Sequence, residues 1–536
     1  KYFFRPGLTW PLRTQAGFGI RVMPAGCIFG HKGPAAFVAQ DAPETLLGLL
    51  ALLSSSTFAY LVSIQLAAAD AAARSYEVGV IQRTPVPELT QEVEARLASL
   101  ARQAWSLKRS LDTVQETSHA FILPSGLNER QTGLDRSVVL AKLEDVQQRL
   151  DDLAFELYGI GLEDRATIEA QSKKSPSTAS EPEALSADDE DGEAEDDDAT
   201  EAPARERVLS WLVGVAFARF DLRLATGERE LPPEPDPFAP LPSRSPGMYP
   251  EGEEPADRPE LLVDDEGHRD DLSARIRSLA ERVQVTVPDD LRPWLARDFF
   301  PLHLKQYSKS RRKAPIYWQL ATPSASYSVW LYLHAFNRDT LFRVQNDYAV
   351  PKLQHEERKL ESLRHLLREG STASQRRELA TQEGFVDELR AFLDEVKRVA
   401  PLWNPNLDDG VILNFAALWR LVPQHKGWQK ELKETWESLC AGKYDWAHLS
   451  MHLWPERVVP KCAQDRSLAI AHGLEEVFWA EDSGGKWLPR KTPSRSVDAL
   501  VEERTSPAVK SALKSLLTAP VAGGSAKKNR RGNSHA

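Results

Sequence analysis

The order of strand-like and helix-like sequence near the start of the chain decides the fold class. GIRVMPAGCIFG, at residues 19–30, consists of short apolar runs broken by Gly and Pro, which is typical of strands and turns. LLGLLALLSSSTFAYLVSIQL, at residues 46–66, then changes period, because Leu46, Leu49 and Leu53 fall on one face of a helix. A small β-rich region with a helix packed on it predicts an α+β fold.

Helical patterns dominate residues 91–170. Leu97 and Leu100 share one apolar face, and Val146 and Leu150 share another further along the chain. Two long antiparallel helices would bury these two faces against each other. We expect them to form a long spacer after the β-rich region.

An aromatic-rich β-hairpin is expected at residues 314–333. Aromatic and polar residues alternate there on both sides of a Thr-Pro-Ser turn, which fits two strands joined by a turn. Tyr317 and Trp318, like Trp10 near the start, are expected to be core aromatics and not base-stacking groups.

The sequence after this hairpin is mainly helical. Charged, heptad-like sequence at 352–399, interrupted at Gly370, predicts a helical hairpin. The aromatic-rich stretch 428–454 predicts further helix. Residues 483–536 have the composition of a loosely ordered tail.

Shifts in composition divide the chain into eight expected segments. Between residues 181 and 201 the chain has 12 acidic and no basic residues. Such a segment buries too little apolar surface to offset the entropy lost when it becomes ordered. The segments are a β-rich domain (1–90), a helical spacer (91–170), an acidic disordered insertion (171–204), a helix (205–230), a proline-rich and acidic linker (231–271), a basic and aromatic β-containing region (272–350), a helical C-terminal domain (351–482) and a loosely ordered tail (483–536).

The charge is unevenly distributed. The formal net charge of −11 by itself argues against a nucleic-acid partner. Between Glu181 and Asp271, however, 28 acidic residues stand against 8 basic ones, a local −20, so the rest of the chain carries +9. Residues 301–360 hold 10 Lys and Arg against 4 Asp and Glu. Such a basic cluster often marks phosphate contacts; the alternative is a solvated loop.

Cysteine usage and hydropathy indicate the compartment. The three cysteines, Cys27, Cys440 and Cys462, are too few and too scattered for a disulfide framework, and no signal peptide opens the sequence. The longest apolar run, 46–53, is far shorter than the roughly 20 residues of a membrane span. We therefore expect a cytoplasmic protein with no membrane partner.

Enzyme signatures are sparse. No Gly-rich phosphate loop is present, and no Ser-His-Asp or Cys-His arrangement can be argued. His448 and His452 lie four residues apart with two cysteines nearby, but no Cys-x-x-Cys pair accompanies them, so packed histidines are favoured over a zinc site. Asp387 with Glu395 and Lys397 resembles a nuclease set, yet within a helical pattern ordinary surface ion pairs are favoured. No catalytic or metal-binding residue is assigned.

Eight stretches occur in an order that resembles a known family. They are FRPGLTWP (4–11), RVMPAGCIFGHKG (21–33), LLALLSSSTFAY (49–60), YEVGVIQRTPVP (76–87), FELYGIGLEDR (155–165), WLVGVAFAR (211–219), APIY (314–317) and LDDGVILNF (407–415). Together they are similar to the C-terminal half of the large adenine-specific DNA methyltransferases of phage-defence and type IIG-like restriction-modification systems, as in BREX (PglX) and DISARM.

The resemblance implies that target recognition and catalysis belong to different domains. In such enzymes the stretch resembling residues 1–90 is a target-recognition domain, and the following helices separate it from the catalytic domain. The family's Gly-rich S-adenosylmethionine motif and its Asn-Pro-Pro-Tyr/Phe loop do not occur in this sequence. The resemblance thus implies that catalysis and its S-adenosylmethionine cofactor belong to an upstream methyltransferase domain, and that no cofactor binds this segment. Double-stranded DNA is the implied partner, with other defence-system subunits as a further class.

The residues present suit DNA recognition. Base readout needs Arg, Lys, Thr or His side chains held at base edges by a rigid scaffold, and a separate basic cluster could hold phosphates and set the register. The candidate DNA-binding residues are Arg5, Thr9, Arg13, Thr14, Arg21, His31 and Lys32 in the opening loops, and Lys305, Lys309, Arg311, Arg312 and Lys313 in the basic cluster.

Two other functions remain open. A non-catalytic specificity subunit acting in trans would carry two similar target domains, whereas only one copy of the Arg-Pro-Gly to Tyr-Glu-Val-Gly region is present. A protein-scaffolding module would use the acidic insertion and the helical hairpin to bind partners without contacting DNA.

Overall fold

The computed structural model describes the chain as two compact units and confirms a mixed α+β fold. Unit 1 comprises residues 1–258 with 278–287, and unit 2 comprises residues 259–277 with 288–536. The finer segments expected from composition stay predictions. The acidic run at 173–202 lies outside the described residues, which are 2–14, 17–66, 74–172, 203–309, 312–367 and 372–519.

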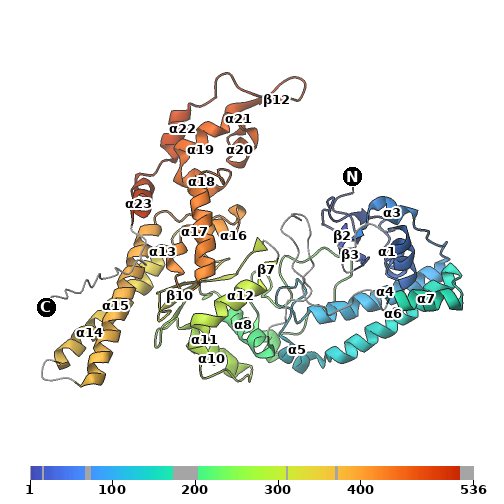
Figure 1. Ribbon diagram of the computed structural model, residues 1–536, viewed down its shortest axis with the longest axis horizontal. Coiled ribbons are helices and arrows are strands. Elements are labelled where there is room, and N and C mark those ends of the chain that lie inside the picture. The colour runs from blue at the N-terminus through green and yellow to red at the C-terminus, as the bar shows by residue number, and fades with distance from the viewer. Residues whose placement is uncertain are drawn as a thin grey trace, which may run out of the picture. The chain divides into compact units, whose positions relative to one another are not determined.

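Unit 1 begins with short strands and continues as helices (Figure 1). Its strands are β1 (Gly7–Thr9), β2 (Arg13–Thr14), β3 (Arg21–Met23), β4 (Ala35–Ala36) and β5 (Arg74–Ser75). Its helices are α1 (Pro43–Leu53), α2 (Ser56–Gln65), α3 (Val78–Arg83), α4 (Gln91–Asp112), α5 (Ser125–Thr132), α6 (Arg136–Tyr158), α7 (Leu162–Ser172), α8 (Ala204–Ala216) and α9 (Leu222–Thr226).

The opening strands form a small antiparallel sheet in the order β3-β1-β4. Leu8 pairs with Val22 on one side and Ala36 on the other, so these three side chains share one face. That face packs on the apolar core of unit 1. Thr9 pairs with Arg21, which places the two side chains on the opposite face.

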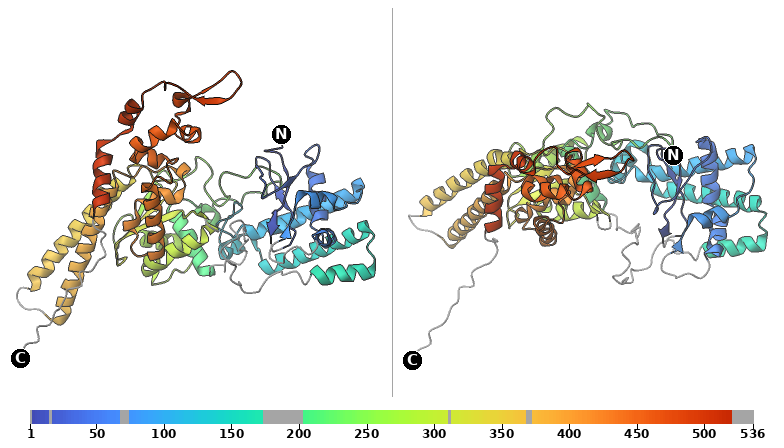
Figure 2. Two further views of the ribbon diagram at one scale, coloured as in Figure 1. Left: turned by 45° about the horizontal axis from the view of Figure 1, so that its top comes forward. Right: turned by 90° about the horizontal axis from the view of Figure 1, so that it is seen from above.

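The predicted helices of this unit are present. Leu46, Leu52 and Leu97 are buried where α1 packs along α4, and α4 in turn packs along α6 (Figure 2). The chain bends between α1 and α2 at Ser55, whose hydroxyl accepts a hydrogen bond from the Phe58 amide and caps α2. Of the described helices, none by itself has the length and apolar composition to cross a membrane; α1 and α2 reach both only together, with a bend of 65° between them.

The helix expected at 205–230 is broken into α8 and α9. The chain leaves α8 through Ala218, which has a φ of 54°, and the Phe220 ring then packs edge-on against Phe121 with 5.0 Å between ring centroids. The stabilisation gained by burying Phe220 is greater than that of continuing the helix. This tertiary effect cannot be read from the local sequence pattern.

Unit 2 combines a buried sheet with many short helices. Its elements are β6 (Leu261–Asp264), α10 (Leu272–Arg282, divided between the units), α11 (Leu291–Trp294), η1 (Leu295–Phe299), α12 (Phe300–Gln306), β7 (Ser308–Lys309), β8 (Arg312–Lys313), β9 (Tyr317–Ala321), β10 (Ser328–Tyr332), α13 (Thr340–Arg343), η2 (Val344–Ala349), α14 (Val350–Leu366), α15 (Ala373–Val399), η4 (Leu407–Asp409), α16 (Val411–Ala416), η5 (Trp419–Leu421), α17 (Lys426–Cys440), α18 (His448–Leu453), α19 (Pro455–Cys462), α20 (Arg466–Ala471), α21 (Glu475–Phe478), β11 (Trp479–Glu481), β12 (Trp487–Pro489), α22 (Val497–Arg504) and α23 (Pro507–Thr518).

The predicted aromatic hairpin forms the centre of this unit. Strands β9 and β10 pair antiparallel, and β6 joins the other edge of β10, giving the order β6-β10-β9. The expectation that Tyr317 and Trp318 are core aromatics is confirmed, because both are fully buried. The Trp318 ring stacks on Phe415 with 3.5 Å between centroids and an interplanar angle of 2°.

The helical hairpin expected at 352–399 is also present as α14 and α15, which lie side by side (Figure 2). The stretch expected to be loosely ordered from residue 483 contains β12, α22 and α23 in its described part. Leu500 joins an apolar cluster, and Leu513 and Leu516 bury one face of α23. The average composition of that stretch is polar, so it did not indicate the few apolar side chains that recur there at helical spacing.

A buried ion network ties β6 to α10 and α11. Arg292 donates to both Asp264 and Asp271, with 2.8 Å between Nη2 and Oδ2 of Asp271. Both aspartates are almost fully buried. Burial raises the pKa of Asp264 to about 6, against the opposing effect of the Arg292 charge.

We predict that Arg292→Met lowers the free energy of unfolding by about 3–5 kcal/mol near neutral pH, because it leaves two buried carboxylates without their cation. Arg269→Met is the matched control, since Arg269 is 84% exposed in its pair with Asp270 and should cost less than about 1 kcal/mol. Urea unfolding of the variants and the wild type measures both costs.

The cost of Arg292→Met should shrink as the pH falls. A carboxyl group whose pKa is raised by folding destabilises the folded state at every pH above its unfolded pKa of about 4, because its charged form is disfavoured there. Protonation of Asp264 at lower pH removes this destabilisation. A cost that is equal at about pH 5 and about pH 7 would contradict this account of the network.

Candidate nucleic-acid interface

One junction of hydrogen bonds joins the two ends of the β-rich region at residues 1–90. The indole Nε1 of Trp10 donates to the Tyr76 carbonyl at 2.9 Å, and the Tyr76 amide donates to the Leu12 carbonyl at 2.6 Å. Trp10 and Tyr76 are both buried, and Phe18 packs against both rings. Strands β2 and β5 continue the junction with Arg13 opposite Ser75. The start and end of this region are thereby held together.

A tight turn is attached to the same junction. Gly33 donates to the Gly30 carbonyl at 3.1 Å, and the Leu12 amide donates to the Lys32 carbonyl at 2.9 Å. The turn therefore carries His31 and Lys32 outward, and both side chains are exposed. Because Leu12 precedes Arg13, the junction brings Arg13 next to this turn.

The candidate base-reading residues fall into two groups. Three of them contribute to the fold: Arg5 forms an ion pair with Asp41 at 2.6 Å, Thr9 donates to the Pro34 carbonyl at 2.8 Å, and Thr14 is buried. The hydrogen bond from Arg5 to Asp41 raises the pKa of the Arg5 guanidinium. The other four are exposed, namely Arg13, Arg21, His31 and Lys32.

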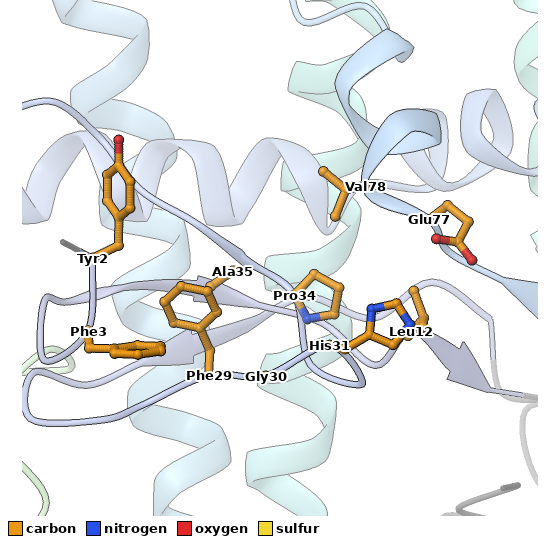
Figure 3. Close-up of a pocket in the computed structure, with 10 residues that line it drawn as sticks. All are labelled: Tyr2, Phe3, Leu12, Phe29, Gly30, His31, Pro34, Ala35, Glu77 and Val78. Atoms are coloured by element: carbon orange, nitrogen blue, oxygen red, sulfur yellow. The ribbon is translucent and has the colours of Figure 1, made fainter. Parts of the chain in front are cut away.

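A pocket of about 490 Å³ lies beside the turn (Figure 3). Tyr2, Phe3 and Phe29 line one end of it, and His31 and Glu77 lie at the other end. Phe3 packs edge-on against Phe29 with 5.1 Å between centroids. The pocket combines aromatic walls with two polar side chains.

The aromatic side of this pocket was missed from the sequence. The apolar run at residues 2–4 is the kind of sequence that forms a strand, and a strand there could pair with the small sheet. Instead they form a turn with Phe4 at a φ of 70°, and the side chains of Tyr2, Phe3 and Phe4 are 46%, 52% and 65% exposed. Three consecutive aromatic residues before Arg5 were the available signal, because successive side chains of a strand point to opposite faces and three such residues in a row do not alternate between apolar and polar.

The basic cluster of unit 2 lies on a two-stranded hairpin, β7 and β8, with Ser308 opposite Lys313. Lys313 is paired with Glu431 and lies over the Trp428 ring at 5.7 Å, so its charge is partly compensated. Lys305 is exposed at the end of α12. Lys309 and Arg312 are placed only by their backbone pairing, and Arg311 lies outside the described residues.

The other chemical candidates lie in unit 2. Within the described ranges, no group of three or more His, Cys, Asp or Glu side chains is arranged to hold a metal ion. Burial raises the pKa of Cys462 to about 11, and the thiol donates to the Val458 carbonyl at 3.4 Å. Asp387 and Glu395 both form ion pairs along α15, with Arg390 and Arg398 respectively.

Comparison with known proteins finds two curated relatives, and no protein-family model matches the chain. The chain is 22% identical over 477 residues to the adenine-specific methyltransferase BrxX of Escherichia coli O9:H4 (strain HS), covering 79% of this chain and 36% of the relative. It is 23% identical over 467 residues to the adenine-specific methyltransferase PglX of Lacticaseibacillus casei (strain Zhang), covering 78% of this chain and 34% of the relative. The chain spans about a third of the length of these relatives.

We predict that Trp10→Phe lowers the free energy of unfolding by about 1–3 kcal/mol, because the buried Tyr76 carbonyl loses its indole donor. Trp105→Phe on α4 is the matched control; Trp105 is partly exposed, with Arg109 over its ring, and should cost less than about 1 kcal/mol. Urea unfolding followed by circular dichroism compares the two, and equal costs would show that the junction contributes little.

Proposed function

The chain is homologous to the BREX adenine-specific methyltransferases BrxX and PglX, and from this premise we propose that it is the DNA-recognition portion of a site-specific N6-adenine methyltransferase in phage defence. Double-stranded DNA is the proposed partner. We assign methyl transfer to the parts of BrxX and PglX with which this chain does not align. Binding of the S-adenosylmethionine cofactor is assigned to the same parts. Neither the Gly-rich cofactor motif nor the Asn-Pro-Pro triplet occurs in this chain, so its residues are assigned to recognition and not to methyl transfer.

The exposed group Arg13, His31 and Lys32 carries the proposal. Each of these side chains can donate hydrogen bonds to base edges in the major groove, and Arg and Lys do so to guanine in particular. The backbone bonds of Leu12 to Lys32 and to Tyr76 hold the segments that bear them, so the group is attached to the core of unit 1 and not to a free loop. Base discrimination requires this fixed geometry.

Phosphate contacts form the second part of the proposal. Basic side chains that touch phosphates add affinity for any sequence and make binding salt-dependent. Lys305 and the β7–β8 hairpin supply such side chains in unit 2, while Lys313 is less available because it pairs with Glu431. The positive balance of the chain outside residues 181–271 supports the same assignment.

We predict that the chain enriches a defined motif from a pool of randomised DNA duplexes, and that Arg13→Met with Lys32→Met abolishes this enrichment. Loss of a base-edge contact costs about 1–3 kcal/mol of discrimination, whereas phosphate contacts made elsewhere remain. Binding to an arbitrary duplex should therefore weaken less than binding to the selected motif. Sequencing the bound pool and titrating at several salt concentrations measure the two effects.

The matched control is Arg96→Met with Lys142→Met, which removes two exposed positive charges from α4 and α6 of the same unit. Motif enrichment should survive in this variant. Binding without any enriched motif in the wild-type chain would contradict base readout, and absence of any duplex binding would favour the scaffolding function. Enrichment of a two-part motif would favour a specificity subunit acting in trans.

A further inference from the structure

The pocket of about 490 Å³ in unit 1 has two chemically different ends (Figure 3). Tyr2, Phe3 and Phe29 form its aromatic end, and His31 and Glu77 form its polar end. A volume of this size lies within the range of pockets that hold small ligands, which also combine apolar walls with a few polar groups. The chemistry of the two ends indicates which ligand fits.

The rings at the aromatic end hold one another in place. Phe29 packs against Phe3 with 5.1 Å and against Phe37 with 5.3 Å between ring centroids. Tyr2 stacks on Phe37 at 5.4 Å with an interplanar angle of 28°, and the Arg5 guanidinium lies over both of these rings. Phe3 is still 52% exposed, so the cluster presents aromatic surface on which a planar ligand can stack.

The polar end is positioned by backbone bonds to a single residue, Leu12. The Leu12 amide donates to the Lys32 carbonyl, in the turn that carries His31. The Leu12 carbonyl accepts from the Tyr76 amide, and Glu77 follows Tyr76 directly in the chain. Two segments that are distant in sequence therefore bring an imidazole and a carboxylate to the same end of the pocket (Figure 3).

These two side chains have complementary hydrogen-bonding capacity. Ser75 Oγ donates to Glu77 Oε1 at 2.9 Å, and within the described ranges no group donates to Glu77 Oε2. The His31 ring is exposed and forms no hydrogen bond with any residue that the structure describes. A carboxylate accepts hydrogen bonds, whereas a neutral imidazole donates one from a ring nitrogen. Together they can bind an amino group that lies next to a ring nitrogen acceptor.

We propose that this pocket binds an unpaired adenine or cytosine of the DNA, an inference that rests on the proposed function. Each of these bases carries an amino group beside a ring nitrogen acceptor, whereas thymine has a carbonyl oxygen in place of the amino group. Glu77 accepts from the amino group, His31 donates to the ring nitrogen, and Phe3 contacts the face of the base. Stacking on aromatic side chains is a general way in which proteins bind unpaired bases.

Only a base outside the helical stack can enter the pocket. In a duplex the amino group and the ring nitrogen are paired with the opposite strand, and both faces of the base are stacked on its neighbours, so an enzyme must flip the base out to reach them. The pocket thus assigns His31 to an unpaired base and leaves the paired bases to Arg13 and Lys32.

A protein segment is the other class of occupant for a pocket with apolar walls. A base is favoured because the acceptor and the donor, Glu77 and His31, lie together at one end, and because the exposed Arg13 and Lys32 are carried beside that end by the same junction and turn. Basic side chains at this position can contact the phosphates that flank the bound base.

Fluorescence anisotropy of labelled DNA duplexes tests the proposal on the full chain. The wild type should bind a duplex with one unpaired adenine about tenfold more tightly than the same duplex fully paired. An unpaired thymine should give a smaller gain, because its carbonyl oxygen faces the Glu77 carboxylate. Phe3→Ser should remove the preference for unpaired adenine and leave binding to the paired duplex unchanged. Glu77→Gln should bring adenine and thymine closer together, because a glutamine amide can also donate to a carbonyl oxygen.

Phe4→Ser is the matched control, since Phe4 is 65% exposed and does not line the pocket, and the preference should survive in this variant. Circular dichroism checks that each variant folds, and Glu77→Gln keeps the test decisive if Phe3→Ser does not fold.

Equal binding of the bulged and paired duplexes by the wild type would overturn the proposal and leave base readout by Arg13 and Lys32 intact; the pocket would then fit a protein segment. A preference for unpaired adenine that neither Phe3→Ser nor Glu77→Gln changes would also overturn it. Failure to bind any duplex would contradict the proposed function itself, and the base pocket with it.

Discussion

The junction between Trp10 and Tyr76 is the contact on which the account of the N-terminal region depends. It joins two segments 66 residues apart through the buried indole bond and the adjacent backbone bond to Leu12. Without it, the turn carrying His31 and Lys32 would be tied to the chain only through its own short strands. With it, a sheet of two- and three-residue strands becomes a fixed platform, because side-chain burial compensates for the few ladder hydrogen bonds.

Charge has different roles in the two units. In unit 1, Arg5 is committed to Asp41, whereas Arg13 and the turn beside it remain exposed. In unit 2, Arg292 and Lys313 neutralise acidic partners within the fold. A basic residue in the sequence is thus no measure of DNA affinity until its ion pairs are known.

Much of the fold follows from local sequence, whereas the sites do not. The helices around Leu97 and Val146 and the hairpin around Trp318 were predictable, because their apolar residues recur at the period of the element they form. The break at Ala218 and the Arg5–Asp41 pair were not, because both depend on residues distant in sequence. The approach of His448 to Asp409 was equally invisible, since 39 residues separate them.

Hydrogen exchange of the chain with and without duplex DNA tests the central claim most directly, because it reports contact along the whole backbone without any substitution. We predict slower exchange on DNA binding at residues 12–14 and 30–33, in the segments that carry Arg13, His31 and Lys32. Protection confined to unit 2, with no change in either segment, would contradict the assignment of base recognition to the N-terminal region.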